Sequence, residues 1–133
     1  MNQSSQKKWN ERYRKGAYGT RTHPSALLTE WLPKLQNHTN GLRAIDIASG
    51  TGRNSICLAQ HGWQVDAFDI SEVALELLEK ESNSRKLPIT CFHQDCEDTE
   101  NQGDYLIDDE YNLAIMIRYT NLSLIRNLYR TLK

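Results

Sequence analysis

Residues 43–54, RAIDIASGTGRN, contain the clearest indication of the fold in this chain of 133 residues. It begins with a short apolar run, which is typical of a buried strand. Gly50 and Gly52 then mark a tight turn, and residues 53–61 have a helical pattern that ends at Gly62. A strand, a turn and a helix in this order are the repeating unit of α/β proteins.

The rest of the chain continues the alternation of strands and helices. Three further segments have the short apolar patterns of strands: residues 64–69, 88–93 and 111–117. Helices are expected over residues 5–15, from Ser25, from Ser71 and over residues 122–132. The helix positions expected to be buried are Leu27, Leu28, Trp31, Leu32 and Leu35; Val73, Ala74, Leu77 and Leu78; and Leu122, Ile125, Leu128 and Leu132. This order predicts right-handed crossovers and an α/β fold, with a Rossmann-like parallel sheet covered by helices on both faces.

The composition limits the class of protein. The chain has room for one domain, residues 1–133. Its 16 basic and 17 acidic side chains leave a net charge of −1, which offers no general attraction to nucleic-acid phosphates. The apolar runs are far shorter than the roughly 20 residues that span a membrane, and the polar N-terminus has no secretion signal. We therefore expect a cytoplasmic protein without nucleic-acid or membrane partners.

Neither the cysteines nor the histidines form a chemical motif. Cys57, Cys91 and Cys96 are widely spaced and include no CxxC pair, so we expect reduced thiols, no disulfide and no metal site. The four histidines are scattered along the chain. No Ser-His-Asp set stands out that would indicate nucleophilic catalysis.

Polar and glycine residues follow the first two predicted strands, at the edge where open α/β sheets bind ligands. Gly50 and Gly52 allow the backbone to approach a ligand closely, and the N–H groups at the start of the next helix offer a site for an anion. Asp69 ends the second strand, where a carboxylate can accept both ribose hydroxyls of an adenosine. An ordinary tight turn and a helix-capping aspartate are the structural alternatives.

The third and fourth strands end in residues that fit the same ligand. Asp95 can accept a hydrogen bond from an adenine amino group, and Ile117 can cover the adenine or line the reaction site. A solvated loop aspartate and core packing of the isoleucine are the alternatives. Four successive strand ends each carry a residue type that adenosine recognition needs, which favours an adenosine site over separate coincidences.

These residues resemble the class I S-adenosylmethionine-dependent methyltransferases. Residues 46–52 resemble the family motif of an acidic residue followed by three spaced glycines, with Ala48 at the first glycine position. We expect this replacement to be mild, because alanine suits most backbones of negative φ. The match extends through residues 53–55 and 69–71. Residues 20–23, followed by a helix, resemble the tellurite-resistance (thiopurine-methyltransferase-like) group, and the likeness covers residues 9–133.

The resemblance implies S-adenosyl-L-methionine as cofactor, S-adenosyl-L-homocysteine as product and a small-molecule acceptor. It assigns the methionine part of the cofactor to Asp46 and the following turn, the ribose to Asp69, and the adenine to Asp95 and the Cys96 N–H. Arg21 or Thr22 would grip the methionine carboxylate. The full set of expected cofactor-binding residues is Arg21, Asp46, Ala48, Ser49, Gly50, Thr51, Gly52, Asn54, Asp69, Ile70, Asp95, Cys96 and Ile117. No catalytic residue is assigned, because this cofactor brings its own electrophile.

The resemblance also implies a strand order of 3-2-1-4, the first part of a seven-stranded methyltransferase sheet. The chain is therefore expected to be incomplete, with residues 113–117 at the sheet edge. This segment has no lysine, proline or inward charge of the kind that protects natural edge strands. We expect the chain to form a homo-oligomer through this edge. The alternative is that the final helix shields it.

A second class of enzyme shares part of the pattern. Residues 50–55, GTGRNS, imitate the GxGxxG motif of NAD(P)-dependent oxidoreductases. Against this, the carboxylate of Asp46 would repel a pyrophosphate, and no second mononucleotide-binding half follows.

A third possibility is a non-catalytic remnant that binds S-adenosylmethionine. In the methyltransferases that the chain resembles, the later strands carry much of the wall that contacts the acceptor. Binding of the cofactor without turnover would identify such a remnant.

Overall fold

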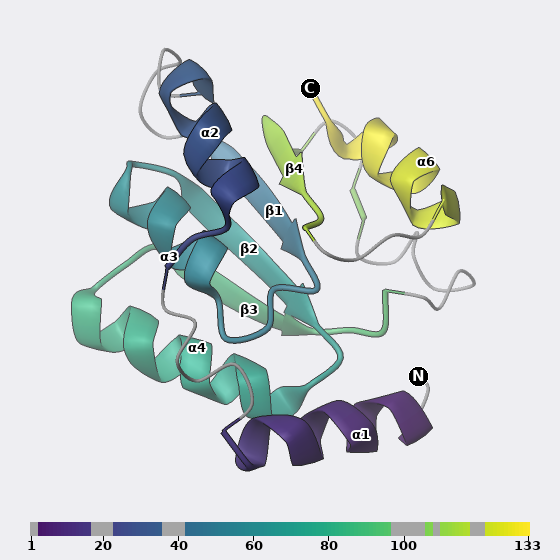
Figure 1. Ribbon diagram of the computed structural model, residues 1–133. Helices are drawn as coiled ribbons and strands as arrows, with labels where there is room; N and C mark the ends of the chain where they lie inside the picture. Colours follow the sequence, from purple (N-terminus) through teal and green to yellow (C-terminus); the bar gives the residue numbers. More distant parts are fainter. Residues whose placement is uncertain (1–2, 17–22, 36–41, 97–105, 108–109, 118–121) are drawn as a thin grey trace.

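The computed structural model describes residues 3–16, 23–35, 42–96, 106–107, 110–117 and 122–133 (Figure 1). Its helices and strands follow the predicted alternation: α1 (Gln3–Arg14), α2 (Ala26–Leu35), β1 (Arg43–Ile47), α3 (Arg53–Gln60), β2 (Gln64–Asp69), α4 (Glu72–Arg85), β3 (Ile89–His93), β4 (Leu113–Ile115) and α6 (Leu122–Thr131). The main difference is β4, which is shorter than the predicted strand over residues 111–117.

The four strands form one parallel sheet in the order β3-β2-β1-β4, which confirms the predicted order. The central strand β1 pairs with β2 and β4, so that Asp46 lies between Ala67 and Ile115. Asp69 at the end of β2 pairs with His93 at the end of β3. Because all strands run in one direction, their carboxyl ends share one edge of the sheet.

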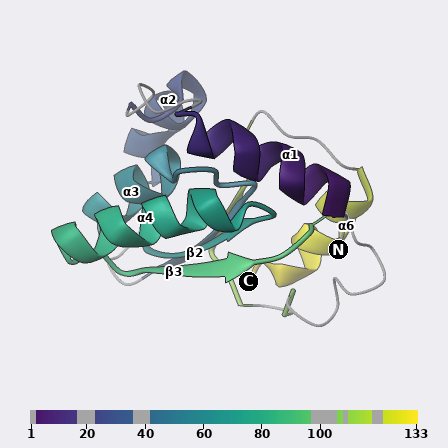
Figure 2. The ribbon, with the colours of Figure 1, turned by 90° about the horizontal axis from the view of Figure 1, so that it is seen from below.

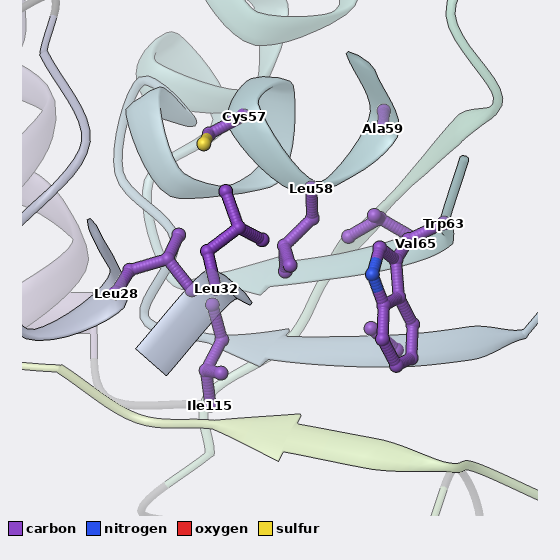
Figure 3. Packing of buried hydrophobic residues seen from close by; sticks show 9 residues of the cluster. Leu28, Leu32, Cys57, Leu58, Ala59, Trp63, Val65 and Ile115 are labelled. Carbon is purple, nitrogen blue, oxygen red and sulfur yellow. The ribbon is translucent and has the colours of Figure 1, made fainter. Parts of the chain in front are cut away.

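Helices cover both faces of the sheet, as predicted. Helices α2, α3 and α4 lie on one face and α6 lies on the other (Figure 1). Alternate residues of each strand point to opposite faces, so Val65 packs towards α2 and α3 while Phe68 packs towards α6. The buried apolar side chains form one cluster on each face of the sheet. Figure 3 shows the cluster on the side of α2 and α3, which includes Leu28, Leu32, Cys57, Leu58, Ala59, Trp63, Val65 and Ile115. Each large apolar side chain buried in this way contributes about 1.5–3 kcal/mol.

Serine side chains cap two of the helices, and the cap at Ser71 was predicted. The Ser25 hydroxyl accepts a hydrogen bond from the N–H of Leu28 at 3.2 Å, at the start of α2. The Ser71 hydroxyl accepts one from the N–H of Ala74 at 3.1 Å, at the start of α4. Each cap satisfies one N–H that the helix itself leaves unpaired.

The predicted buried faces of α2, α4 and α6 are wrong at four positions, whose side chains are 43–53% exposed: Leu27, Trp31, Leu77 and Ile125. Each helix meets the rest of the molecule along a narrower stripe than its apolar residues suggest. On α4 the stripe consists of Ala74, Leu75, Leu78 and Ser82. On α6, Leu124 and Leu128 are buried instead of Ile125.

A polar cluster near the amino ends of the strands holds the segment before β4 in place. Asp66 accepts hydrogen bonds from Arg43 Nη2 at 2.6 Å and from the Tyr111 hydroxyl at 2.7 Å. Arg43 also pairs with Glu110. Burial, and then the contact with Asp66, raises the pKa of Tyr111 far above its usual range, so the tyrosine remains a donor. The cluster thereby connects β1, β2 and the start of β4.

The last residues of the chain form backbone hydrogen bonds with Tyr111, which lies just before β4. The N–H of Tyr111 donates to the carbonyl of Thr131 at 2.7 Å, and the N–H of Lys133 donates to the carbonyl of Tyr111 at 2.9 Å. These bonds form a parallel bridge between Tyr111 and Leu132. In the sheet that the described residues form, β4 is still the last strand, and α6 packs on a face rather than across the edge.

Candidate functional site

Asp46 is a buried carboxyl group at the carboxyl edge of the sheet. Its Oδ2 accepts a hydrogen bond from the Ser55 hydroxyl at 2.6 Å. Burial raises the pKa of Asp46 from 3.8 to about 7, and the charge of Asp69 adds to this shift. The hydrogen bond from Ser55 and the charge of Arg53 oppose it. A positively charged ligand beside Asp46 would favour its ionised form.

Asp69, the last residue of β2, is a second buried carboxyl group at the same edge. Its Oδ2 accepts from the N–H of Gly50 at 2.9 Å, and its Oδ1 accepts from the N–H of Ser71 at 2.8 Å. Burial raises the pKa of Asp69, whereas these two hydrogen bonds and the nearby His93 oppose the shift. The backbone N–H of Ile70 also lowers the pKa of Asp69, and a carboxylate with about four acceptor sites keeps capacity for a further donor beside these backbone groups.

The backbone of the turn is left-handed at three residues. Its φ angles are +57° at Ala48, +58° at Gly50 and +86° at Gly52. The expected negative φ at Ala48 is therefore wrong, because the turn itself requires the left-handed conformation at this position. Glycine adopts that conformation freely, whereas a residue with a β-carbon is less stable there by about 1–2 kcal/mol.

The two glycines of the turn have different neighbours. A β-carbon at Gly50 would lie 2.9 Å from the Tyr13 hydroxyl oxygen of α1. At Gly52 a β-carbon would collide with the end of the Leu78 side chain in α4. Packing of the start of α3 against α4 therefore requires a glycine at position 52. The predicted contact of Gly52 with a ligand stays a prediction.

Ser49 provides an independent indication of a ligand in the turn. Its hydroxyl oxygen is buried and has no hydrogen-bond partner among the residues that the structure describes. A buried polar group without a partner is destabilising by about 1–3 kcal/mol. A bound molecule with a polar group at this position would satisfy the hydroxyl, so Ser49 fits a ligand site beside Thr51 and the two glycines.

The segment after β3 lies beside the end of β2. The N–H of Gln94 donates to the carbonyl of Asp69 at 3.0 Å. Asp95 and Cys96, which follow directly, are both buried. The carbonyl of Ile70 lies 2.9 Å from Nε2 of His93. The structure thus brings the predicted ribose and adenine residues to neighbouring strand ends.

Two other predicted site residues, Asn54 and Ile117, have contacts with α2 or its start, and their contact with a cofactor stays a prediction. The Asn54 side-chain oxygen accepts a hydrogen bond from the N–H of Ser25 at 2.8 Å, which joins the starts of α3 and α2. Ile117 is half-buried and packs against the cluster of Leu28 and Leu32, in line with the structural alternative. Arg21 lies outside the described residues, as does Thr22.

Sequence reasoning missed the contribution of α1. Trp9 and Tyr13 lie one helical turn apart with ring centroids 6.1 Å apart, and Tyr13 reaches the glycine turn. The i, i+4 spacing of the two aromatic residues in a polar segment is the signal that points to this contact face. The Ser55 hydroxyl on Asp46 was also missed, although it lies on the first turn of α3.

Within the described part of the chain, no group of three or more His, Cys, Asp or Glu side chains is placed to hold a metal ion. None of the described helices has both the length and the apolar character needed to cross a membrane.

In a comparison with protein families, the family model of the methyltransferase domain matches residues 44–133. A comparison with curated proteins finds no match to this sequence.

Three solved structures have a similar fold. A Methanococcus maripaludis protein described as a proposed S-adenosyl-L-methionine-dependent methyltransferase is 21% identical, with a TM-score of 0.66 over 98% of this chain and 58% of that one. TehB from Haemophilus influenzae is 18% identical, with a TM-score of 0.65 over 89% of this chain and 41% of that one.

The third structure is a methyltransferase from Geobacter sulfurreducens in complex with S-adenosyl-L-homocysteine. It is 21% identical, with a TM-score of 0.63 over 83% of this chain and 45% of that one. At these identities the likeness shows a shared fold. The chain spans 41–58% of the length of the three proteins.

Proposed function

The chain belongs to the methyltransferase domain family, and from this membership we propose that it binds S-adenosyl-L-methionine and takes part in methyl transfer. The single observation that supports this most directly is the pair of buried carboxyl groups next to the left-handed glycine turn: Asp46 precedes the turn in β1, and Asp69 accepts the N–H of Gly50. The solved relative from Geobacter sulfurreducens contains S-adenosyl-L-homocysteine, which supports the same ligand class here.

The residues of the edge would each hold one part of the cofactor. Asp69 would accept the ribose hydroxyls, and Asp95 with the Cys96 N–H would bind the adenine. Asp46 and the turn from Ala48 would hold the methionine part, where the Ser49 hydroxyl gains a partner. The cofactor supplies a methyl group on a positively charged sulfur. The chain itself contributes binding, orientation and exclusion of water.

Charge favours this ligand over a dinucleotide. Asp46 and Asp69 are both buried; burial, and to a smaller extent the charge of Asp69, raises the pKa of Asp46. A cation relieves this repulsion, whereas a pyrophosphate adds to it. We therefore favour S-adenosylmethionine over NAD(P).

The proposed acceptor is a small molecule in the cytoplasm. The net charge of −1 supports an acceptor other than nucleic acid. The likeness of residues 20–23 to the tellurite-resistance (thiopurine-methyltransferase-like) group supports a small acceptor.

We further propose that the chain self-associates through the surface around β4. The strand lies at the end of the sheet that the described residues form, and apolar side chains are exposed on the helices of both faces: Leu27, Trp31, Ile125 and Tyr129. A symmetric dimer is the simplest assembly that pairs such a surface with itself.

The binding proposal is tested by calorimetric titration of the full chain with S-adenosyl-L-homocysteine. NAD is titrated in parallel as the competing ligand class. We expect saturable heat with the first ligand alone; heat with NAD alone would support the oxidoreductase alternative. Transfer of a labelled methyl group to small thiol, oxyanion and halide acceptors then tests activity. Binding without any transfer would indicate the remnant rather than an enzyme.

A further inference from the structure

Helix α1 packs against α4 beside the carboxyl ends of the strands. It lies beneath the strand arrowheads in Figure 1 and again alongside α4 in the turned view of Figure 2. None of its residues is buried. The side chains turned towards the rest of the molecule recur every three or four residues and are half-buried: Gln6, Trp9, Asn10 and Tyr13. Contacts with polar groups therefore make up much of its attachment.

Two of these side chains bind the start of α4. Asn10 Oδ1 accepts a hydrogen bond from the Ser71 hydroxyl at 2.6 Å and lies 3.4 Å from the N–H of Val73. Gln6 Nε2 donates to Glu72 Oε1 at 2.7 Å and lies 3.2 Å from Nε2 of His93. Helix α1 is thus attached to the turn between β2 and α4, which directly follows Asp69.

Ser71 connects this attachment to the proposed ribose site. Its N–H donates to Asp69 Oδ1 at 2.8 Å, and its hydroxyl donates to Asn10 at 2.6 Å. The three residues Asp69, Ser71 and Asn10 form a continuous chain of hydrogen bonds. A ligand that fixes Asp69 therefore also favours the docked position of α1.

Tyr13 lies beside Gly50, the turn residue whose N–H binds the same carboxyl group. Its hydroxyl oxygen lies 2.9 Å from where a β-carbon of Gly50 would stand, and the N–H of Gly50 donates to Asp69 Oδ2. Asn10 and Tyr13 are three residues apart on one face of α1. Together they place this helix over the glycine turn.

We propose that α1 is a removable cover over the cofactor site, in which Tyr13 contacts the bound cofactor and Asn10 is a positioning residue that keeps the cover docked. The inference rests on the proposed function, because the covered ligand is the cofactor. A helix attached largely through hydrogen bonds opens readily, since water replaces those bonds when it leaves. Opening admits the ligand, and redocking retains it.

Binding of S-adenosyl-L-homocysteine to the full chain and to four variants tests the inference. Asn10→Ala removes the acceptor of the Ser71 hydroxyl, and we expect the Kd to rise about three- to ten-fold, mainly through faster dissociation. Asn10→Asp keeps an acceptor next to the N-terminus of α4, and this variant is expected to bind the ligand like the parent. Tyr13→Phe is expected to weaken binding to a similar extent as Asn10→Ala. Glu11→Ala, on the exposed side of α1, is the control and is expected to leave the Kd unchanged.

Amide hydrogen exchange supplies a readout that a purely structural role would not change. In the parent, S-adenosyl-L-homocysteine is expected to slow exchange across α1, and in Asn10→Ala this protection is expected to be lost while that of α3 remains. If the parent binds the ligand but α1 exchanges at the same rate with and without it, the cover is refuted. Unchanged dissociation in both Asn10→Ala and Tyr13→Phe would refute it equally. If the parent itself binds no ligand, the proposed function fails, which is a separate result.

Discussion

The N–H of Gly50 donates a hydrogen bond to Asp69 Oδ2 at 2.9 Å, and so fixes the turn after β1 to the carboxyl group at the end of β2. The two residues are 19 positions apart in the chain. A ligand that binds Asp69 is therefore held directly against the backbone of the turn.

Replacing the Asp69 carboxyl group tests its role in binding. We expect Asp69→Ala to weaken binding of S-adenosyl-L-homocysteine by about 1.5–3 kcal/mol, because a charged acceptor of hydroxyl groups is lost. Calorimetry measures the Kd, and circular dichroism checks that the variant is folded. Glu76→Gln, an exposed change on α4, is the matched control. Parental affinity in a folded Asp69→Ala protein would place the adenosine elsewhere.

Relief of the left-handed backbone at Ala48 is expected to stabilise the protein. Ala48→Gly removes a cost of about 1–2 kcal/mol in the folded state and adds about 0.4–1 kcal/mol of chain entropy to the unfolded state. The net expectation is a gain of roughly 0.5–1 kcal/mol in the free energy of unfolding. Ala74→Gly, inside α4, serves as the control and is expected to be destabilising. Equal losses from both changes would contradict a strained Ala48.

The pH dependence of stability follows from Asp46. Its pKa rises from 3.8 to about 7 on folding, so its contribution to stability is complete below pH 3.8 and is lost as the pH rises through about 7. The free energy of unfolding of the ligand-free protein should therefore fall between about pH 4 and about pH 7. Asp46→Asn should reduce the slope of the free energy of unfolding against pH. The slope that remains in this variant is expected to come from Asp69, whose pKa is also raised. Denaturant titrations across this range provide the measurement; an identical slope in Asp46→Asn would count against the shift.

Gly52 and Leu78 are expected to behave as a coupled pair. The β-carbon of Gly52→Ala would collide with the Leu78 side chain, and overpacking of this kind costs about 1–3 kcal/mol. Leu78→Ala alone should also be destabilising, because Leu78 is fully buried. Combining the two changes should cost less than the sum of the single changes. Strict additivity in chemical denaturation would show that the glycine has another role.

The oligomeric state tests the surface around β4. We expect a dimer by light scattering during size-exclusion chromatography at tens of micromolar protein. Ile125→Glu and Tyr129→Glu place charges on the exposed side of α6 and should shift the equilibrium towards the monomer. Glu79→Gln on α4 is the control. A parent that remains monomeric on concentration would overturn the proposal.

The sequence predicted the fold and the positions of both buried carboxyl groups, because strand and helix patterns are local and the carboxyl ends of parallel strands share an edge. It did not predict the left-handed φ of Ala48, which the geometry of the whole turn imposes. The collision that explains Gly52 involves Leu78, which is distant in sequence. The role of α1 was also missed: the i, i+4 spacing of Trp9 and Tyr13 indicates a contact face, but it does not show which part of the molecule that face contacts.

The order of strands in the sheet has a consequence for how the protein folds. β1, β2 and β3 are neighbours both in sequence and in space, whereas β4 crosses back to pair with β1, as Ala44 does with Leu113. Contacts between nearby segments close shorter loops and form earlier than distant ones. We therefore expect residues 43–93 to form the folding nucleus. β4 and α6 are expected to pack onto this nucleus at a later stage of folding. Asp46, the glycine turn and Asp69 all belong to the early unit, so we expect the candidate site to form before β4 completes the sheet.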